Sequence, residues 1–225
     1  MKIVRTNPLL NTPALRVKLV CAVLAAASLS ACAPLMIGAA AGGALVATDR
    51  RTSGAQVEDK AIELKTSNRL GEAFAGRAHI NVNAYNRMVL LTGEVPAEPD
   101  RLTAEQITSR VENVGSVVNQ LVVLPNSSLS TRSSDVLLAG KVRATLVDAR
   151  DVISSAFDIV VERGEVYLMG IVSEREANRA AELAASIEGV KKVVKVFQIV
   201  SEDELAQRQP KPVSSESGNA QASPR

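Results

Sequence analysis

The chain has 225 residues, of which 46% are hydrophobic but only 2% are aromatic, so any core must be aliphatic. That length allows one or two ordinary domains. Its formal net charge of +2 depends on four basic residues, the only charged side chains in the first 31 positions; without them, 22 basic residues face 24 acidic ones, a net charge of −2. This balance excludes a global basic field for nucleic acid, and any anion binding must come from a local patch.

The first 31 residues are predicted to be a signal peptide. A basic, acid-free start leads into LVCAVLAAASLSA, an apolar segment too short for a comfortable membrane span. It ends in LSAC, residues 29–32, which resembles the lipobox of bacterial lipoproteins. The alternative is a coincidental cysteine after an ordinary secretory signal.

The lipobox resemblance implies that Cys32 receives a diacylglyceryl thioether and, after cleavage, an N-acyl (palmitoyl) chain; no other cofactor is expected. Several acyl chains anchor a protein stably where one does not. Because Cys21 lies in the discarded segment, the mature protein has no free thiol. By resemblance to lipoprotein sorting, Ala33 in place of Asp implies the periplasmic face of the outer membrane.

From about Val57 the same pattern of elements occurs twice. In the first copy a helix precedes the strand HINVNAY, a turn at Asn86-Arg87 and the strand MVLLTGEV; after PAEPD come a second helix and the strand SVVNQLVVL. The expected core residues of the two helices are Ala61, Leu64, Leu70, Ala73 and Phe74, then Ala104, Ile107, Val111 and Val114.

The second copy repeats this order. A helix from Asp135 carries Leu138, Val142 and Leu146 on one face, and the strands FDIVVER and EVYLMGIV flank a turn at Arg163-Gly164. Ser173 and Glu176 form a capping-box pattern before an alanine-rich helix, and GVKKVVKVFQIV is the last strand. The predicted fold class is α+β, with two αββαβ units that each pack two helices on a small mixed three-stranded sheet.

These patterns divide the chain into six segments. They are a signal peptide (1–31), an acylated N-terminus and glycine-rich tether (32–53), a first domain (54–125), a Ser-rich linker (126–133), a second domain (134–200) and a disordered tail (201–225). Gly93 and Gly170 occupy matching strand positions, where glycine indicates close backbone approach or a bulge, or else merely loosens the strand end.

The repeated order, with GEVYLMGIV and IEGVKKVVKVFQIV, resembles the BON domain, a small module of bacterial envelope proteins. Gly164, Gly170 and Gly189 follow its pattern, whereas Arg87 and Asn113 replace two glycines in the first copy. Two copies behind a lipobox resemble the dual-BON outer-membrane lipoproteins, which are division- and stress-associated lipid-binding proteins. That resemblance implies binding of anionic phospholipid through the second domain, a role in envelope integrity and enrichment at the division site.

The residues themselves point to one surface for such binding. Beside the core stripe of the helix from Asp135 lie Val136, Leu137, Lys141 and Arg143. Apolar groups can enter the acyl boundary while neighbouring cations meet phosphate headgroups. The alternative is that Val136 and Leu137 pack against the first domain and the cations are only solvated. Lys191, Lys192 and Lys195 are interpreted as edge-strand protection against aggregation.

No enzyme is predicted. His79, the only histidine, has no cysteine partner and no adjacent carboxylate in the sequence, so neither a metal site nor a catalytic site is expected. Three hypotheses remain: a membrane-anchored lipid-binding module, a protein-interaction adaptor for outer-membrane assembly or cell-wall remodelling machinery, and a purely structural stabiliser of the envelope.

Overall fold

The computed structural model describes residues 49–208. The signal peptide, Cys32 and most of the tether therefore lie outside the described residues, as does the tail from residue 209. Within residues 49–208, no helix is both long and apolar enough to cross a membrane.

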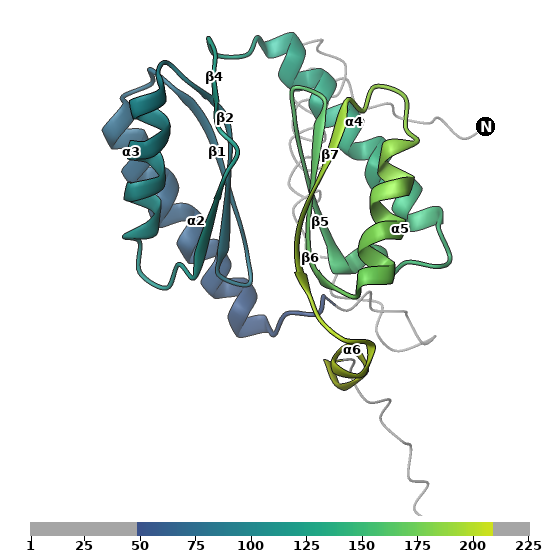
Figure 1. Ribbon diagram of the computed structural model, residues 1–225. Coiled ribbons are helices and arrows are strands. Elements are labelled where there is room, and N and C mark those ends of the chain that lie inside the picture. Colours follow the sequence, from purple (N-terminus) through teal and green to yellow (C-terminus); the bar gives the residue numbers. More distant parts are fainter. Residues whose placement is uncertain (1–48, 209–225) are drawn as a thin grey trace, which may run out of the picture. The chain divides into compact units, whose positions relative to one another are not determined.

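The first copy contains helices α2 (Ser53–Phe74) and α3 (Glu98–Ser109) and strands β1 (His79–Tyr85), β2 (Met88–Val95), β3 (Ser116–Asn119) and β4 (Val122–Val123). Strand β1 pairs antiparallel with β2, while β3 and β4 pair parallel with β2. The expected third strand is thus present but interrupted at residues 120–121. Helices α2 and α3 cover one face of this sheet (Figure 1).

The second copy contains helices α4 (Leu129–Asp148) and α5 (Glu174–Ala185), a short 3-10 helix (Ser154–Ala156) and strands β5 (Phe157–Glu162), β6 (Glu165–Val172) and β7 (Lys192–Ile199). Strand β6 is central, antiparallel to β5 and parallel to β7. Helices α4 and α5 cover one face of this sheet (Figure 1). The predicted α+β class with mixed sheets is confirmed in both copies.

Both hairpin turns are built in the same way. Asn86 and Arg87 in the first copy, and Arg163 and Gly164 in the second, all have positive φ, as two-residue hairpin turns that match the strand twist require. A buried aspartate of the preceding helix accepts hydrogen bonds from both turn N–H groups: Asp59 in the first copy and Asp135 in the second, at 2.7–2.8 Å. The repeat therefore keeps this turn even where arginine replaces glycine.

The paired glycines mark close approach of backbone. A Cβ on Gly93 would lie 2.1 Å from the carbonyl oxygen of His79, and one on Gly170 would lie 2.4 Å from that of Ala156. No side chain fits at either distance, so these glycines allow the neighbouring strand to pass. The structure thus selects close backbone approach over a loosened strand end.

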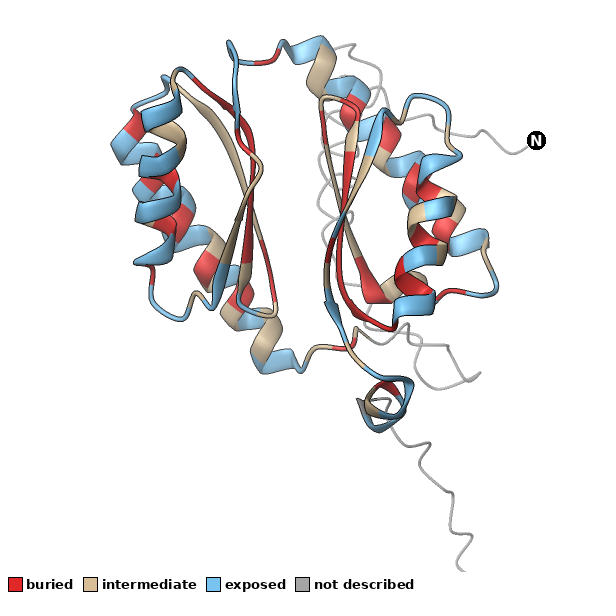
Figure 2. Ribbon diagram, in the orientation of Figure 1, coloured by how far each residue is buried: buried red, intermediate tan, exposed pale blue. Residues whose placement is uncertain are grey.

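Each sheet buries its helix-covered face in a core of its own. Figure 2 shows buried residues along the strands and on the helices that cover them. In the second copy the expected stripe of Leu138, Val142 and Leu146 is confirmed, and Ala177, Ala180 and Ala184 of the alanine-rich helix are buried alongside it. The predicted capping box at Ser173 and Glu176 is also present.

The predicted core face of α2 was partly wrong. Leu64 is 64% exposed and Ala73 is also exposed, whereas Ile62, Leu70 and Phe74 are buried. The buried face of this helix also includes Asp59, which holds the hairpin turn, and Thr66. The spacing of apolar residues cannot reveal a buried aspartate whose hydrogen bonds are made to the hairpin turn. The sequence therefore predicted a buried face of α2 that is rotated from the observed one.

A third cluster contains residues of both copies. It includes Tyr85 and Leu90 from the first sheet and Tyr167, Met169, Ile171 and Val196 from the second. Leu205 of helix α6 (Glu202–Arg208) belongs to it as well. The expectation of disorder from residue 201 is therefore corrected for α6, because the apolar side chain of Leu205, in a mostly polar helix, is buried in this cluster.

Candidate functional site: the exposed face of helix α4

Helix α4 begins earlier than the sequence predicted. It starts at Leu129, where the side chain of Ser128 caps it by accepting a hydrogen bond from the N–H of Thr131 at 3.2 Å. Residues 129–133 of the expected linker are therefore helical. Serine is common in linkers but is also a favoured N-cap, and the Ser-rich composition concealed this start.

One side of α4 is fixed to its domain. Leu138, Val142 and Leu146 are buried in the core of the second copy, and Asp135 is buried with its two carboxylate oxygens on the N–H groups of Arg163 and Gly164. The helix therefore cannot rotate to hide its opposite side without losing this packing.

The opposite side of α4 is apolar and open to solvent. Val136 is 72% exposed and Leu137 70%, and Leu129 and Val147 are exposed to 80% and 62%. Because successive helical residues turn by about 100°, these four side chains fall within an arc of about 100°, together with the small residues Ser133, Gly140 and Ala144. We refer to Leu129, Val136, Leu137 and Val147 as the α4 stripe. Exposure on this scale excludes the alternative that Val136 and Leu137 pack against the first domain.

Basic residues flank this stripe. On the same helical geometry Lys141 lies on one side of it and Arg143 on the other, and both are exposed. Arg143 is 3.9 Å from Asp158, a loose ion pair between partly exposed groups, and Lys141 has no ion-pair partner among residues 49–208. Asp148 ends the helix beyond the stripe.

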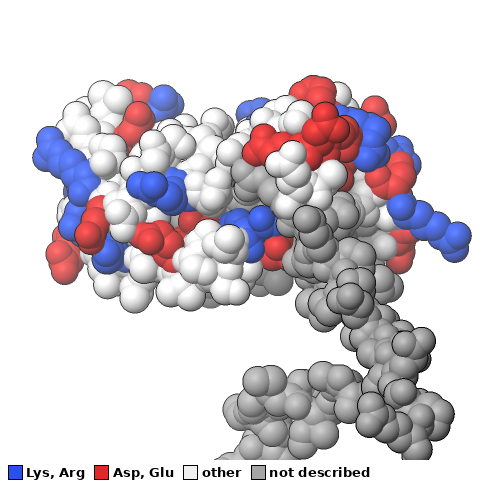
Figure 3. Space-filling model, turned by 90° about the horizontal axis from the view of Figure 1, so that it is seen from below, with Lys and Arg blue, Asp and Glu red and all other residues white. Residues whose placement is uncertain are grey.

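The rest of the charge is dispersed. In Figure 3, basic and acidic side chains are interspersed over the face shown. Lys192 pairs with Glu165 at 3.3 Å, Lys195 donates to the side chain of Asn178 at 2.9 Å, and Lys191 donates to the carbonyl oxygen of Arg163 at 2.9 Å. All three lysines near β7 therefore have partners within their own domain. An apolar stripe with cations at its borders is the arrangement by which helices lie in a membrane interface.

Two stripe residues were missed by the sequence analysis. Leu129 fell in the expected linker, so its place on the helix was not considered. Val147 lies 18 residues further on, which is five helical turns. Leu129 could have been found had the helix been started at the Ser128 cap. Val147 lies about three turns beyond Val136 in the helix already expected, so helical periodicity alone could have found it.

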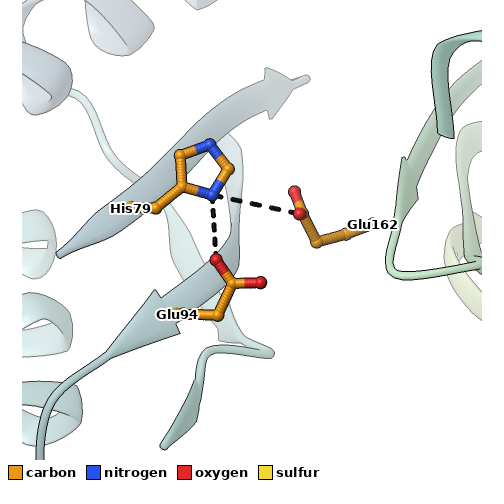
Figure 4. A group of neighbouring side chains, drawn as sticks. All are labelled: His79, Glu94 and Glu162. Carbon is orange, nitrogen blue, oxygen red and sulfur yellow. Dashed lines mark hydrogen bonds and ion pairs between the residues drawn. The ribbon is translucent and has the colours of Figure 1, made fainter. Parts of the chain in front are cut away.

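A second group of polar side chains, His79, Glu94 and Glu162, occurs where the two copies meet (Figure 4). His79 Nδ1 is 3.0 Å from Glu94 Oε2 and 4.0 Å from Glu162 Oε1. Contrary to the sequence-based expectation, His79 therefore has adjacent carboxylates. Glu94 is its direct cross-strand partner in the β1–β2 register.

The two carboxylates of this group differ in their surroundings. Burial alone would raise the pKa of Glu94, but hydrogen bonds from the Ser127 N–H, His79 and Arg163 lower it below its ordinary value. Burial raises the pKa of Glu162, assisted by the nearby negative charges of Glu94 and Asp135, and the hydrogen bond from Asn81 only partly opposes this.

Comparison with known proteins identifies the family. The BON domain matches residues 58–125 and again residues 134–201. The outer membrane lipoprotein DolP of Haemophilus influenzae is 40% identical over 173 residues, which cover 76% of this chain and 89% of that protein.

The chain belongs to the dual BON-domain outer-membrane lipoproteins. A protein named 21 kDa hemolysin, from Actinobacillus pleuropneumoniae, is 30% identical over 154 residues, covering 68% of this chain and 79% of that protein. Among solved structures, the C-terminal domain of CdsD from the type III secretion system of Chlamydia trachomatis matches with 10% identity and a TM-score of 0.27, covering 60% of this chain and 96% of that domain.

Proposed function

We propose that this lipoprotein, anchored through acylated Cys32, binds anionic phospholipid with the α4 stripe of its second BON domain. In this role it helps to maintain the envelope and gathers where such lipids collect, the division site included. The observation that supports the proposal is the exposure of four apolar side chains on a helix whose opposite face is fixed in a core.

The energetics suit an anchored protein. Each basic residue near an anionic surface contributes about 1 kcal/mol, so Lys141 and Arg143 alone give weak binding. Leucine and valine side chains that enter the acyl boundary add to this, because burial of such a side chain contributes roughly 1.5–3 kcal/mol when complete. A protein already held at the membrane by acyl chains needs no more, since its local concentration is high.

The test is sedimentation with vesicles, using an unacylated chain from residue 33 onward, which retains Arg50 and both domains. We expect the wild type to bind anionic but not zwitterionic vesicles, and to bind less as salt rises. Leu137→Glu combined with Lys141→Glu should weaken binding by at least about 10-fold, because it removes an apolar contact and reverses a charge.

Helix α2 offers a matched control. Lys60 and Leu64 have the same four-residue separation as Leu137 and Lys141, and Leu64 is 64% exposed. Lys60→Glu with Leu64→Glu should leave vesicle binding unchanged. Equal loss in the two double variants, or no binding by folded wild type, would overturn the proposed lipid surface.

One observation favours an adaptor function in addition. Val122, Val123 and Leu124 are 37–43% exposed at β4, and within residues 49–208 this strand pairs with β2 alone. An open strand edge with apolar side chains can accept a strand of a partner. Saturable binding to a purified envelope-assembly or cell-wall remodelling protein, lost in Val123→Lys but kept in Leu137→Glu, would support this second function.

A further inference from the structure

Three potential metal ligands converge where the two BON domains meet. His79 on β1 and Glu94 on β2 belong to the first domain, and Glu162 at the end of β5 belongs to the second. One atom of each, His79 Nδ1, a Glu94 oxygen and a Glu162 oxygen, lies within 4.8 Å of the other two. Figure 4 shows the three side chains pointing toward one another from separate strands.

The distances suit a small divalent cation. Ligand atoms about 2.0–2.2 Å from a tetrahedral Zn²⁺ are about 3.4 Å from each other. His79 Nδ1 lies 3.0 Å from Glu94 Oε2 and 4.0 Å from Glu162 Oε1, values on either side of that separation. Small rotations of the side chains would therefore complete the geometry.

The second oxygen of each carboxylate is already held in place. Asn81 donates to Glu162 Oε2 at 2.6 Å, and Arg163 Nη1 is 3.2 Å from Glu94 Oε1. Such partners orient metal-binding carboxylates in known sites. They direct Glu162 Oε1 and Glu94 Oε2 toward His79. The Ser127 N–H also donates to Glu94 Oε2 at 3.1 Å, which leaves a further lone pair of this oxygen for an ion.

Glu162 supplies the observation that points to a missing positive partner. Its side chain is only 6% exposed and lines a cavity, and no group among residues 49–208 donates a hydrogen bond to its Oε1, which lies 4.0 Å from His79 Nδ1. A carboxylate in such surroundings is stabilised by a nearby positive charge. A cation bound between this oxygen, Glu94 and His79 would supply that charge.

The group is also accessible. A cavity of about 280 Å³ is lined by His79, Asn81 and Glu162 together with Asp135 and Val136 of helix α4. It provides a route for an ion and space for the water molecule that completes a three-ligand zinc site.

We propose that His79, Glu94 and Glu162 form a Zn²⁺ site that links the two BON domains. One imidazole and two carboxylates favour zinc over calcium, which needs six to eight oxygen ligands, and over magnesium, which retains an octahedral shell of water. Because the ligands come from both domains, the bound ion holds them together. None of the three ligands belongs to the α4 stripe, although Val136 of the stripe lines the same cavity, and the proposed Zn²⁺ binding does not rest on the proposed lipid binding.

The experiment uses the chain from residue 33 to 225, which contains both domains and no cysteine, after removal of metal by a chelator. Calorimetric titration should show one equivalent of Zn²⁺ bound, and the thermal midpoint should rise with free Zn²⁺, since the ion binds the folded state. Ca²⁺ and Mg²⁺ should produce neither effect. His79→Gln and Glu162→Gln should each weaken Zn²⁺ binding by at least about 10-fold.

The matched control is Glu112→Gln, which removes an exposed carboxylate of the first domain and should leave Zn²⁺ affinity unchanged. A measurement on the wild type guards against misfolded variants. His79 is the sole histidine, so its imidazole ¹⁵N signals report directly on binding and should shift at Nδ1 when Zn²⁺ is added. A folded wild type whose imidazole signals do not respond to Zn²⁺, or equal affinity in folded His79→Gln, would overturn the proposal.

Discussion

The guanidinium of Arg50 forms two parallel hydrogen bonds with the carboxylate of Glu176, each 2.8 Å long, and both side chains are only 5% exposed. Arg50 also donates to the carbonyl oxygen of Ile171 at 2.8 Å. The segment that leads into the first domain is thus attached to the second domain. A bidentate ion pair between arginine and a carboxylate is among the stronger charged interactions in proteins.

Glu176→Gln should destabilise the protein by about 3 kcal/mol at neutral pH, because it leaves the buried charge of Arg50 without its partner. Glutamine preserves the capping function at this helix position, so the variant isolates the ion pair. Denaturant unfolding at pH 7 measures the loss. A change below about 0.5 kcal/mol would show that the pair contributes little.

The same pair predicts a pH dependence. Burial alone would raise the pKa of Glu176. This effect is outweighed by hydrogen bonds from Arg50 and from the Ser173 N–H, together with the positive charge of Arg50, so the pKa lies below the ordinary value of 4.5. A lowered pKa stabilises the folded state above pH 4.5, and this contribution is lost as the pH falls through the depressed value. The stability difference between wild type and Glu176→Gln should therefore narrow below pH 4.5.

Gly170→Ala should destabilise the second domain by about 2 kcal/mol or more, because its Cβ would lie 2.4 Å from the carbonyl oxygen of Ala156. Gly71→Ala in helix α2 is the control: outside the adjoining backbone of the helix itself, no atom lies within 4 Å of the added Cβ, and alanine favours the helix by about 0.5–1 kcal/mol. The two changes in free energy of unfolding should thus have opposite signs. Destabilisation by both would contradict this interpretation.

Both tyrosines should resist ionisation in the folded protein. Burial raises the pKa of Tyr85 to about 12, assisted by the charge of Asp49, and burial also raises the pKa of Tyr167, assisted by Glu165. The chain has no tryptophan, so tyrosinate absorption is easily followed. At about pH 11 we expect little tyrosinate until denaturant is added. Stability should fall as the pH rises above 10, where unfolded tyrosines lose their protons.

Leu129→Ser tests the part of the α4 stripe that lies before the expected start of the helix. It should weaken binding to anionic vesicles several-fold without lowering stability, because Leu129 is 80% exposed. Leu102→Ser on α3, where the side chain is 53% exposed, should have no effect on vesicle binding. If Leu129→Ser bound as tightly as wild type, the membrane contact would be confined to the later turns of α4.

Much of the fold was predictable because it rests on local patterns. Strand alternation, the stripe of Leu138, Val142 and Leu146, and the Ser173 capping box are set by residues close in sequence. The start of α4 and the helix α6 were missed because their compositions are typical of linkers and tails. Leu205 is buried by residues of distant strands, and no local pattern records this.

The polar group around His79 was predictable in part. A two-residue turn at Asn86-Arg87 sets the hairpin register and pairs His79 with Glu94 by counting outward from Tyr85 and Met88. That count was available from sequence alone. The approach of Glu162 to His79 could not be predicted from the sequence, because it depends on how the two repeats pack together.

The cluster shared by Tyr85, Leu90, Tyr167, Met169 and Ile171 has a consequence for the protein as a duplicated molecule. Had the repeats remained independent, each could have been lost, exchanged or multiplied without harm to the other. Their apolar surfaces instead complete one another, so either repeat alone would expose aromatic and aliphatic side chains to water. We therefore expect the pair to melt in one calorimetric transition and to be inherited as a unit.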